Sequence, residues 1–395
     1  MVFESIVIGK GLIGSAAARY LSQSHNNVAV LGPDEARDPE KAVVFSSHYD
    51  EARIQRVIGA DPVWTLLNLQ SAEQYPFLQK ESNINFHSGV GCLYVNPTGN
   101  DTYLEQIEAQ AGQFGVSYQL FTHVQAIYES FPHFNFPEPS KSIFESSPSG
   151  YINPRLLIKA QLSLFKKNKG VIIDDVAIEI IDRENYIQIT TLNGKTYKAK
   201  KVLLAPGAFI NSFNLIRKKL TLRLKSETTI WANVGAEEAQ RLSGLPSLLY
   251  EIELPEYRNL YLIQPVRYPD GKYYLKMGCN LPGDLYFDNL KEIQNWFRRG
   301  NSDANMKDLR DALMAIMNGL KVKSFFTKRC IVAFTKHGKP YIGPLNDNGL
   351  FVAAGGNGYS AMCSDALGRI ASHLLTEGIF PPEYSAALFQ PVFSG

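Results

Sequence analysis

The sequence has few of the residues that staple small secreted domains or bind metal ions. Its 395 residues include four cysteines, none in a CxxC pair, which excludes a disulfide framework. The seven histidines show no HxH or HExxH spacing, and we expect no metal site. So little cysteine is typical of a reducing compartment, and we expect a cytoplasmic protein.

An excess of charge and long apolar runs are also missing. Lys+Arg number 40 and Asp+Glu 38, so the net charge of +2 gives no electrostatic footprint for nucleic acid. No stretch approaches the roughly 18 apolar residues of a membrane span. The first residues include Glu4 and lack the basic and apolar regions of a signal peptide. We expect a soluble protein that binds neither nucleic acid nor membrane, acting as a monomer or small homo-oligomer.

What the chain does contain is ordinary globular composition, with 45% hydrophobic and 20% charged residues. Its length predicts two or three domains' worth of chain. The stretch richest in proline and serine, 131–149, is interpreted as a loop or connector.

The first forty residues carry the clearest motif. A β-branched run over 3–8 leads into Gly9-Lys-Gly11-Leu-Ile-Gly14, then into a small-residue helix, and 27–31 supplies a second strand. In this strand–turn–helix context GxGxxG predicts a dinucleotide site. Gly9 allows the tight turn, Gly11 lets the backbone approach a pyrophosphate, and Gly14 lets the helix pack against the strand. Asp34, twenty residues after Gly14, is the candidate for binding the ribose.

Several further segments resemble the monomeric sarcosine oxidase and N-methyltryptophan oxidase family of D-amino-acid-oxidase-like flavoproteins. They are Ser46-Ser-His48-Tyr-Asp-Glu-Ala-Arg53-Ile-Gln-Arg56, Val202–Phe209, Cys330–Thr335 with Pro340–Pro344, and Gly349–Tyr359. Order and spacing hold over nearly the whole chain, with the weakest match over 216–320. The resemblance implies FAD as cofactor.

The fold implied is α/β with two domains. A Rossmann-like FAD-binding domain would be built from 1–84, 150–215 and 321–395. A second, mainly antiparallel-sheet domain would roof the flavin, built from 85–149 and 216–320. The alternating runs 260–266 and 272–278 suit roof strands, while 152–167, 288–300 and 303–319 are typical of helices. Motif and resemblance together predict these FAD-binding residues: Gly9, Gly11, Leu12, Ile13, Gly14, Asp34, Ser47, His48, Arg53, Val176, Gly207, Cys330, Gly355, Gly356, Asn357 and Gly358.

The resemblance also implies roles in chemistry. Cys330 matches the cysteine that forms a thioether to the flavin. Arg53 would lie against the flavin, and Arg56 would fork onto the substrate carboxylate, which a planar guanidinium suits. Lys276 matches the lysine that activates oxygen, because a fixed ammonium stabilises a developing superoxide.

Three positions depart from the family pattern. The carboxylate-binding lysine falls at Met362, beside Gly358 of the flavin loop, and the active-site histidine falls at Asn280. The roof tyrosine falls near Leu262. Tyr49 and Arg267 are candidates to replace the missing contacts with the substrate.

The expected reaction is oxidation of an amine or amino acid to an imine, with O₂ reduced to hydrogen peroxide. One alternative is a flavin dehydrogenase that passes electrons to another acceptor. The other is a flavin-binding scaffold that has lost catalysis, which the departures at Met362 and Asn280 motivate.

Overall fold

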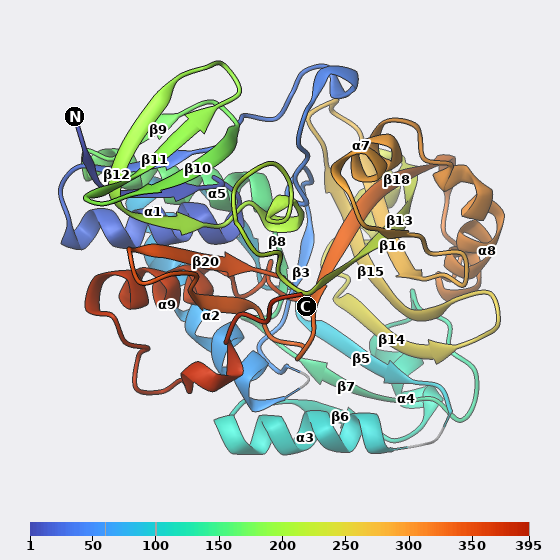
Figure 1. Ribbon diagram of the computed structural model, residues 1–395. Helices are drawn as coiled ribbons and strands as arrows, with labels where there is room; N and C mark the ends of the chain where they lie inside the picture. Colours follow the sequence, from blue (N-terminus) through green and yellow to red (C-terminus); the bar gives the residue numbers. More distant parts are fainter. Residues whose placement is uncertain (60, 99–100, 395) are drawn as a thin grey trace.

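The computed structural model describes residues 1–59, 61–98 and 101–394. Within these ranges the strands form sheets of eight, nine and three strands. In Figure 1 the eight-stranded sheet lies on the left and most of the nine-stranded sheet on the right. This is the α/β fold with a second, mainly antiparallel sheet that the sequence predicts.

The eight-stranded sheet has a parallel centre. Its order is β10-β11-β12-β1-β2-β9, and β20 pairs in parallel with the second half of β12. Its strands are β1 (Phe3–Ile8), β2 (Val28–Leu31), β9 (Val171–Ile173), β10 (Ala177–Arg183), β11 (Tyr186–Thr191), β12 (Thr196–Leu204), β19 (Tyr341–Pro344) and β20 (Leu350–Ala354). The helices of this half are α1 (Leu12–Ser24), α2 (Pro62–Ser82), α5 (Pro154–Lys167) and α9 (Ser364–Glu377).

Small residues let α1 lie close to its neighbours. Ala17 and Leu21 are fully buried in the same apolar cluster as Ile370 of α9. A Cβ on Gly368 of α9 would meet the α1 backbone at 2.6 Å, so glycine is what this crossing requires. The strand–turn–helix–strand opening predicted from the sequence is therefore confirmed.

The nine-stranded sheet is antiparallel except where β14 meets β5. Its order is β17-β13-β16-β15-β14-β5-β7-β6, and β18 pairs along the other edge of β13. Its strands are β5 (Cys92–Asn96), β6 (Gln119–Phe121), β7 (Lys141–Glu145), β13 (Leu222–Val234), β14 (Ser247–Glu253), β15 (Arg258–Arg267), β16 (Tyr273–Asn280), β17 (Tyr286–Phe287) and β18 (Val322–Thr335). Helices α3 (Thr102–Phe114), α4 (Val124–Ser130), α6 (Ala236–Arg241), α7 (Leu290–Arg299) and α8 (Met306–Ile316) belong to this half.

Short elements complete the chain. β3 (Arg53–Gln55), β8 (Gly150–Ile152) and β4 (His87–Ser88) form the three-stranded sheet. The 3-10 helices are η1 (Pro39–Lys41), η2 (Gly207–Phe209), η3 (Ser302–Asn305) and η4 (Ala386–Leu388).

Two expectations differ from the structure. The segment 131–149 is not only a connector, because β7 lies within it and pairs with both β5 and β6. The sheet boundary also falls later than 321, because β18 pairs with β13 from Val322 to Thr335. Strand pairing joins residues far apart in sequence, and local composition does not reveal it.

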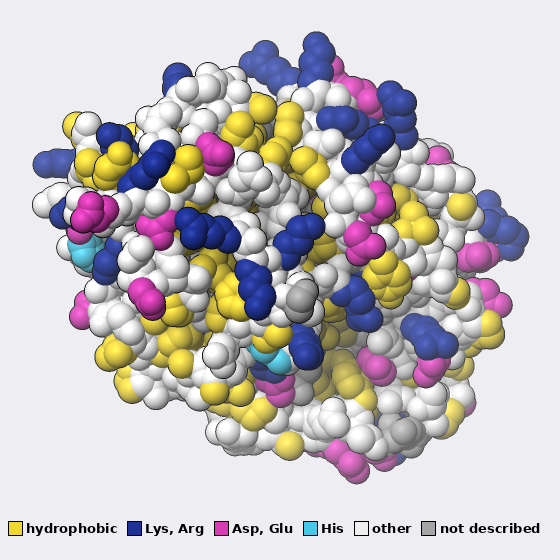
Figure 2. Space-filling view, in the orientation of Figure 1, with side chains coloured by type: hydrophobic (Ala, Val, Ile, Leu, Met, Phe, Trp, Pro, Cys, Tyr) yellow, Lys and Arg dark blue, Asp and Glu magenta, His cyan; other side chains and the backbone are white. Residues whose placement is uncertain are grey.

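No helix in the described part of the chain is both long and apolar enough to cross a membrane. On the face drawn in Figure 2, basic and acidic side chains are interspersed, as the near-neutral net charge leads one to expect.

Candidate active site

Glycine turns follow the carboxyl ends of the parallel strands. Gly9 follows β1, Gly32 follows β2, Gly207 follows β12 and Gly355 follows β20. Gly9, Gly207 and Gly355 have positive φ angles of 104°, 61° and 84°, which L side chains rarely adopt. Ligands of open α/β sheets bind at this edge, so these turns mark the dinucleotide site.

The first turn is built to receive an anion. A Cβ on Gly14 would collide with the Gly9 carbonyl oxygen, so glycine permits the close packing of α1 against β1. Helix α1 begins after Gly11, with no side-chain cap and no acidic residue in its first turn. The first amide groups of the helix, those of Leu12 and Ile13, are therefore free to bind a phosphate. The helix dipole favours negative charge at this end of α1. These residues fit the pyrophosphate of FAD.

Asp34, the residue expected to bind the ribose, forms an ion pair with Lys10 that the sequence does not predict. Asp34 lies beyond β2, and its carboxylate accepts a hydrogen bond from the Lys10 ammonium inside the GxG turn. Asp174 lies 3.6 Å from the same ammonium. Lys10 is buried while Asp34 is largely exposed. Asp34 thus lies where the ribose is expected, with its charge already paired.

The remaining predicted FAD residues lie around the same edge. Asn357, with Gly356 and Gly358 beside it, anchors its loop to β18, because its side-chain oxygen accepts from the Thr335 amide at 2.9 Å. Val176 lies between β9 and β10, with its carbonyl accepting from the Leu192 amide at 2.8 Å.

The segment after β2 carries His48 toward this site. Its Nδ1 hydrogen-bonds Ser46, and the carbonyl of Ser47 accepts from Arg53 at 2.6 Å. Burial, reinforced by Arg155 and Arg53, lowers the pKa of His48 to about 3. His48 is therefore a neutral ring among cations.

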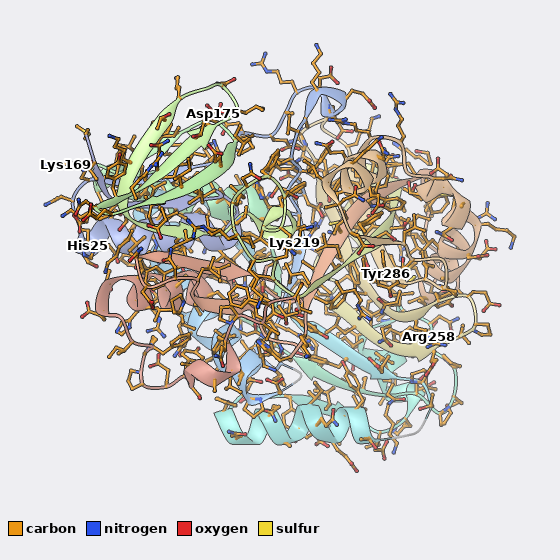
Figure 3. The ribbon with its side chains drawn as sticks, in the orientation of Figure 1. His25, Lys169, Asp175, Lys219, Arg258 and Tyr286 are labelled. Carbon is orange, nitrogen blue, oxygen red and sulfur yellow. The ribbon has the colours of Figure 1, made fainter. Side chains whose placement is uncertain are left out.

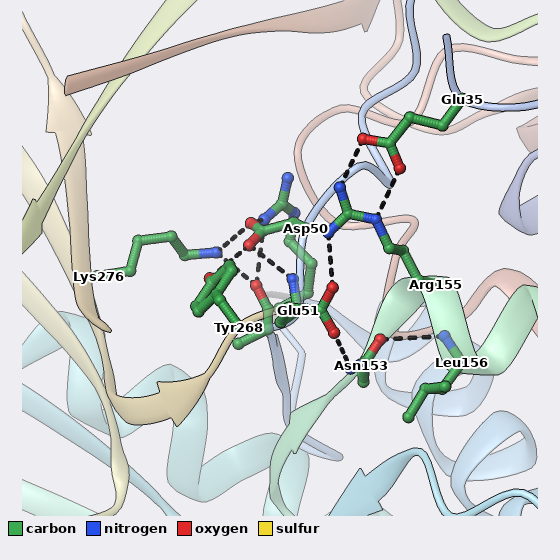
Figure 4. Close-up of polar contacts among 10 residues, drawn as sticks. Glu35, Asp50, Glu51, Asn153, Arg155, Leu156, Tyr268 and Lys276 are labelled. Atoms are coloured by element: carbon green, nitrogen blue, oxygen red, sulfur yellow. Dashed lines mark hydrogen bonds and ion pairs between the residues drawn. The ribbon is translucent and has the colours of Figure 1, made fainter. Parts of the chain in front are cut away.

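Asp50 joins the two halves of the site (Figure 4). Its carboxylate accepts from the Lys276 ammonium at 2.6 Å and from the Tyr268 hydroxyl at 2.7 Å, and it pairs with Arg53. Lys276 also donates to the Ala52 carbonyl. Burial and the charge of Arg53 hold the pKa of Lys276 well below its ordinary value. The structure thus brings Arg53 and Lys276 together through an acid that the sequence did not single out.

Arg56 is a buried cation of the site, like Lys276. It is 4% exposed, and its Nε has no hydrogen-bond partner. The guanidinium carbon lies 5.6 Å from the Tyr94 ring centre and 5.5 Å from that of Tyr359. Within residues 1–59, 61–98 and 101–394 no carboxylate pairs with it. The nearby Glu145 instead accepts from the Tyr94 hydroxyl at 2.7 Å and from the Val57 amide at 2.9 Å.

The nine-stranded sheet supplies the roof, with Cys330 at one side. Cys330 on β18 is the register partner of Glu227 on β13. Burial raises the pKa of the Cys330 thiol, and Arg53 opposes the rise. Burial likewise raises the pKa of Glu227 to about 7, with Lys225 opposing it. A buried acid therefore lies beside the candidate attachment cysteine.

Near Leu262, where the roof tyrosine is expected, the structure places Tyr261 opposite Gly278 of β16. Leu262 is fully buried in the apolar cluster behind the sheet, with Met277. The Tyr261 ring lies across Gly278, where a Cβ would be 2.5 Å from its hydroxyl oxygen. The β15–β16 register shifts on both sides of this position, so residue counting could not place it.

The expected substitutes for the missing contacts are dispersed. Tyr49 lines the cavity of Lys10 and Asp34 instead of neighbouring Arg56. Arg267 is exposed near the β15–β16 turn. Asn280 accepts from the Lys225 ammonium at 2.9 Å. Met362 is buried, and the structure gives its side chain no polar role.

Comparisons with known proteins agree with this fold. The family model of FAD-dependent oxidoreductases named DAO matches residues 4–374. N-methyl-L-tryptophan oxidase of Yersinia pestis (strain Pestoides F) is 28% identical over 212 residues, which are 53% of this chain and 55% of that protein. The chain therefore spans about half the length of the curated relatives it matches.

Solved structures share the fold at low identity. NikD, an unusual amino acid oxidase essential for nikkomycin biosynthesis, superposes with a TM-score of 0.79 at 17% identity, covering 100% of this chain and 98% of that one. Glycine oxidase from Geobacillus kaustophilus gives 0.73 at 16% identity, covering 98% of each chain. L-proline dehydrogenase from P. horikoshii gives 0.72 at 16% identity, covering 98% of this chain and 96% of that one. With the family model matched over most of its length, the chain belongs to the DAO family of FAD-dependent oxidoreductases.

Proposed function

We propose that this chain oxidises the C–N bond of an amine or amino acid that carries a carboxylate, and that O₂ is reduced to hydrogen peroxide. The observation that carries this proposal is Arg56, a buried guanidinium without an acidic partner in the described residues. A buried cation is costly unless it is paired, so an anion from the substrate is its natural partner.

The glycine turns and the start of α1 would hold FAD, which supplies the acceptor for two electrons from the substrate carbon. Arg56 would fix the carboxylate by two parallel hydrogen bonds and so orient the neighbouring C–H. The Tyr261 ring lies across Gly278 of β16 and would limit the space for substrate beneath this strand. Water would then hydrolyse the imine to a carbonyl compound and an amine.

The charges of the site favour a neutral amine. Arg53 and Lys276 share the single carboxylate of Asp50, and no carboxylate in the described residues forms an ion pair with Arg56, so the surroundings are cationic. A nearby like charge disfavours an ammonium, so the substrate would react as the free base, the form that can give up its C–H electrons.

We also infer a thioether between the Cys330 sulfur and a carbon of the flavin ring system. Forming it would break the S–H bond and one C–H bond of the flavin, and the two electrons released would pass through the flavin to O₂. The Cys330 thiol is half-buried on the roof and lies among Arg53 and Lys276, whose charges favour the thiolate. The four cysteines are free thiols, which supports a cytoplasmic location.

The test of carboxylate binding combines a substitution of Arg56 with a substrate whose carboxylate is replaced by an amide. Arg56→Ala should slow flavin bleaching by an N-alkyl amino acid, measured without air, by roughly a hundredfold, because a charged contact is lost. Bleaching by the matching N-alkyl amino acid amide should change little.

Arg258→Ala is the control, because this arginine is exposed on β15 (Figure 3). Equal losses on both substrates would remove Arg56 from carboxylate binding. Bleaching without peroxide release under air would indicate a dehydrogenase, and no bleaching by any amine would indicate a scaffold.

A further inference from the structure

A second lysine lies on the roof face that carries Cys330. Lys328 precedes Cys330 by two residues on β18, so both side chains leave the same face of the strand. Across the sheet, Thr229 is the register partner of both Lys328 and Gly278. Two residues further along β13, on the same face of the sheet, Trp231 is the partner of Lys276. Each such set of register partners on one face is called a row. Lys328 therefore lies one row from Lys276.

Its side chain leans toward the Lys276 row. The Lys328 ammonium lies 3.6 Å from the ring centre of Trp231, 5.8 Å from that of Tyr268 and 5.9 Å from that of Phe326. The three rings form an open aromatic cage for a cation. No hydrogen-bond acceptor or ion-pair partner of this ammonium is found in the described ranges.

The charged groups that face Lys328 come from five elements. They are Arg155 of α5, Glu35 of the segment after β2, Asp270 of the β15–β16 turn, Arg53 of β3 and Lys276 of β16. Burial, then Arg155, lowers the pKa of Lys328 to about 8, and Arg53 acts in the same direction. The Lys328 ammonium is therefore expected to lose its proton near pH 8, where the folded protein can be studied.

Lys276 differs from Lys328 in the acceptors that its ammonium already has. Its ammonium already donates to Asp50 and to the Ala52 carbonyl, and Asp50 also pairs with Arg53. Two cations thus share one carboxylate, and Lys276 has few donors left. The N–H groups of the Lys328 ammonium have no acceptor in the described residues, so they can bind an anion that forms near Lys276.

We propose that the Lys328 ammonium is a second positive charge on the Lys276 side of the flavin, and that it speeds reoxidation by O₂. This rests on the proposed function. Bound FAD, once reduced, would supply two electrons and, with solvent, two protons, so that O₂ becomes hydrogen peroxide. The first electron produces superoxide, an anion, which a nearby fixed ammonium stabilises without exchanging atoms. The same charge should stabilise sulfite bound at the flavin.

The test uses Lys328→Met on the FAD-loaded protein. With the flavin reduced by dithionite, its reoxidation by O₂ should be about tenfold slower than in the wild type, because one positive charge near the reacting atoms is lost. The dissociation constant for sulfite should rise by a similar factor. Lys328→Arg should retain most of both properties.

Lys323→Met is the matched control, because Lys323 is, like Lys328, an exposed lysine of β18 but lies five residues away from it. The wild-type reoxidation rate should fall as pH rises through about 8, since the ammonium loses its proton there, and Lys328→Met should lack this step.

Unchanged reoxidation and sulfite binding in Lys328→Met would overturn the proposal. Should that variant not fold, a wild-type rate without a fall near pH 8 would overturn it as well. Because dithionite replaces the substrate, the result stands apart from whether any amine is oxidised.

Discussion

At the scale of single residues, Cys330 gives the most direct chemical prediction. Flavin should remain with the acid-precipitated wild-type protein, and Cys330→Ser should release it, because the hydroxyl is a far weaker nucleophile than a thiolate. The measurement is flavin fluorescence of the protein band on a denaturing gel.

Cys279→Ala is the control for this prediction. Cys279 lies on the neighbouring strand β16 but is buried in the apolar cluster behind the sheet, so its loss should leave the label in place. A wild-type flavin fully released by acid would refute the thioether and leave the fold unaffected.

Single residues also show how far sequence reasoning reaches. The family resemblance predicts Arg53, Arg56 and Lys276, and the structure places Arg53 and Lys276 on one carboxylate. The sequence does not single out that carboxylate, Asp50, although it lies within the segment 46–56. Its partner Lys276 is 226 residues away, and only packing decides that such distant charges meet.

At the scale of elements, the start of α1 depends on Gly14. Gly14→Ala should lower the free energy of unfolding by about 1–3 kcal/mol, because the added Cβ collides with the Gly9 carbonyl oxygen. The shifted helix should also bind FAD less well. Urea unfolding and the ratio of flavin to protein absorbance measure the two effects.

Gly112→Ala provides a control of opposite sign. Gly112 lies inside α3, and a Cβ there meets nothing within 4 Å, so alanine should stabilise the helix by about 0.5–1 kcal/mol. Two variants that change stability equally would contradict the role given to the turn.

Elements with strong local patterns were predicted well. The helix expected over 152–167 is α5, and the two roof runs are β15 and β16. The roof tyrosine is expected only near Leu262, and irregular pairing shifts the register there, between Arg258 and Tyr261. A one-residue shift exchanges the faces of a strand, and the spacing of residues does not show it.

At the scale of the whole molecule, the site exists only where the two sheets meet. The eight-stranded sheet contributes the glycine turns, while the nine-stranded sheet contributes Lys276, Lys328 and Cys330. The segment 48–56 crosses between them, since His48 lines a cavity with Lys10 after β1, while Asp50 contacts Lys276 of β16 and Arg56 lies near Tyr94 of β5. The resemblance covered both halves, but the assignment of β18 to the roof sheet needed the structure.

The central claim is that the opening glycine turn holds a flavin that takes electrons from a carbon bonded to nitrogen. The most direct measurement is the visible spectrum of the purified protein during anaerobic addition of an N-alkyl amino acid. We predict a flavin band that bleaches on addition and returns with air, releasing hydrogen peroxide. A folded, colourless protein that takes up no added FAD would contradict the account.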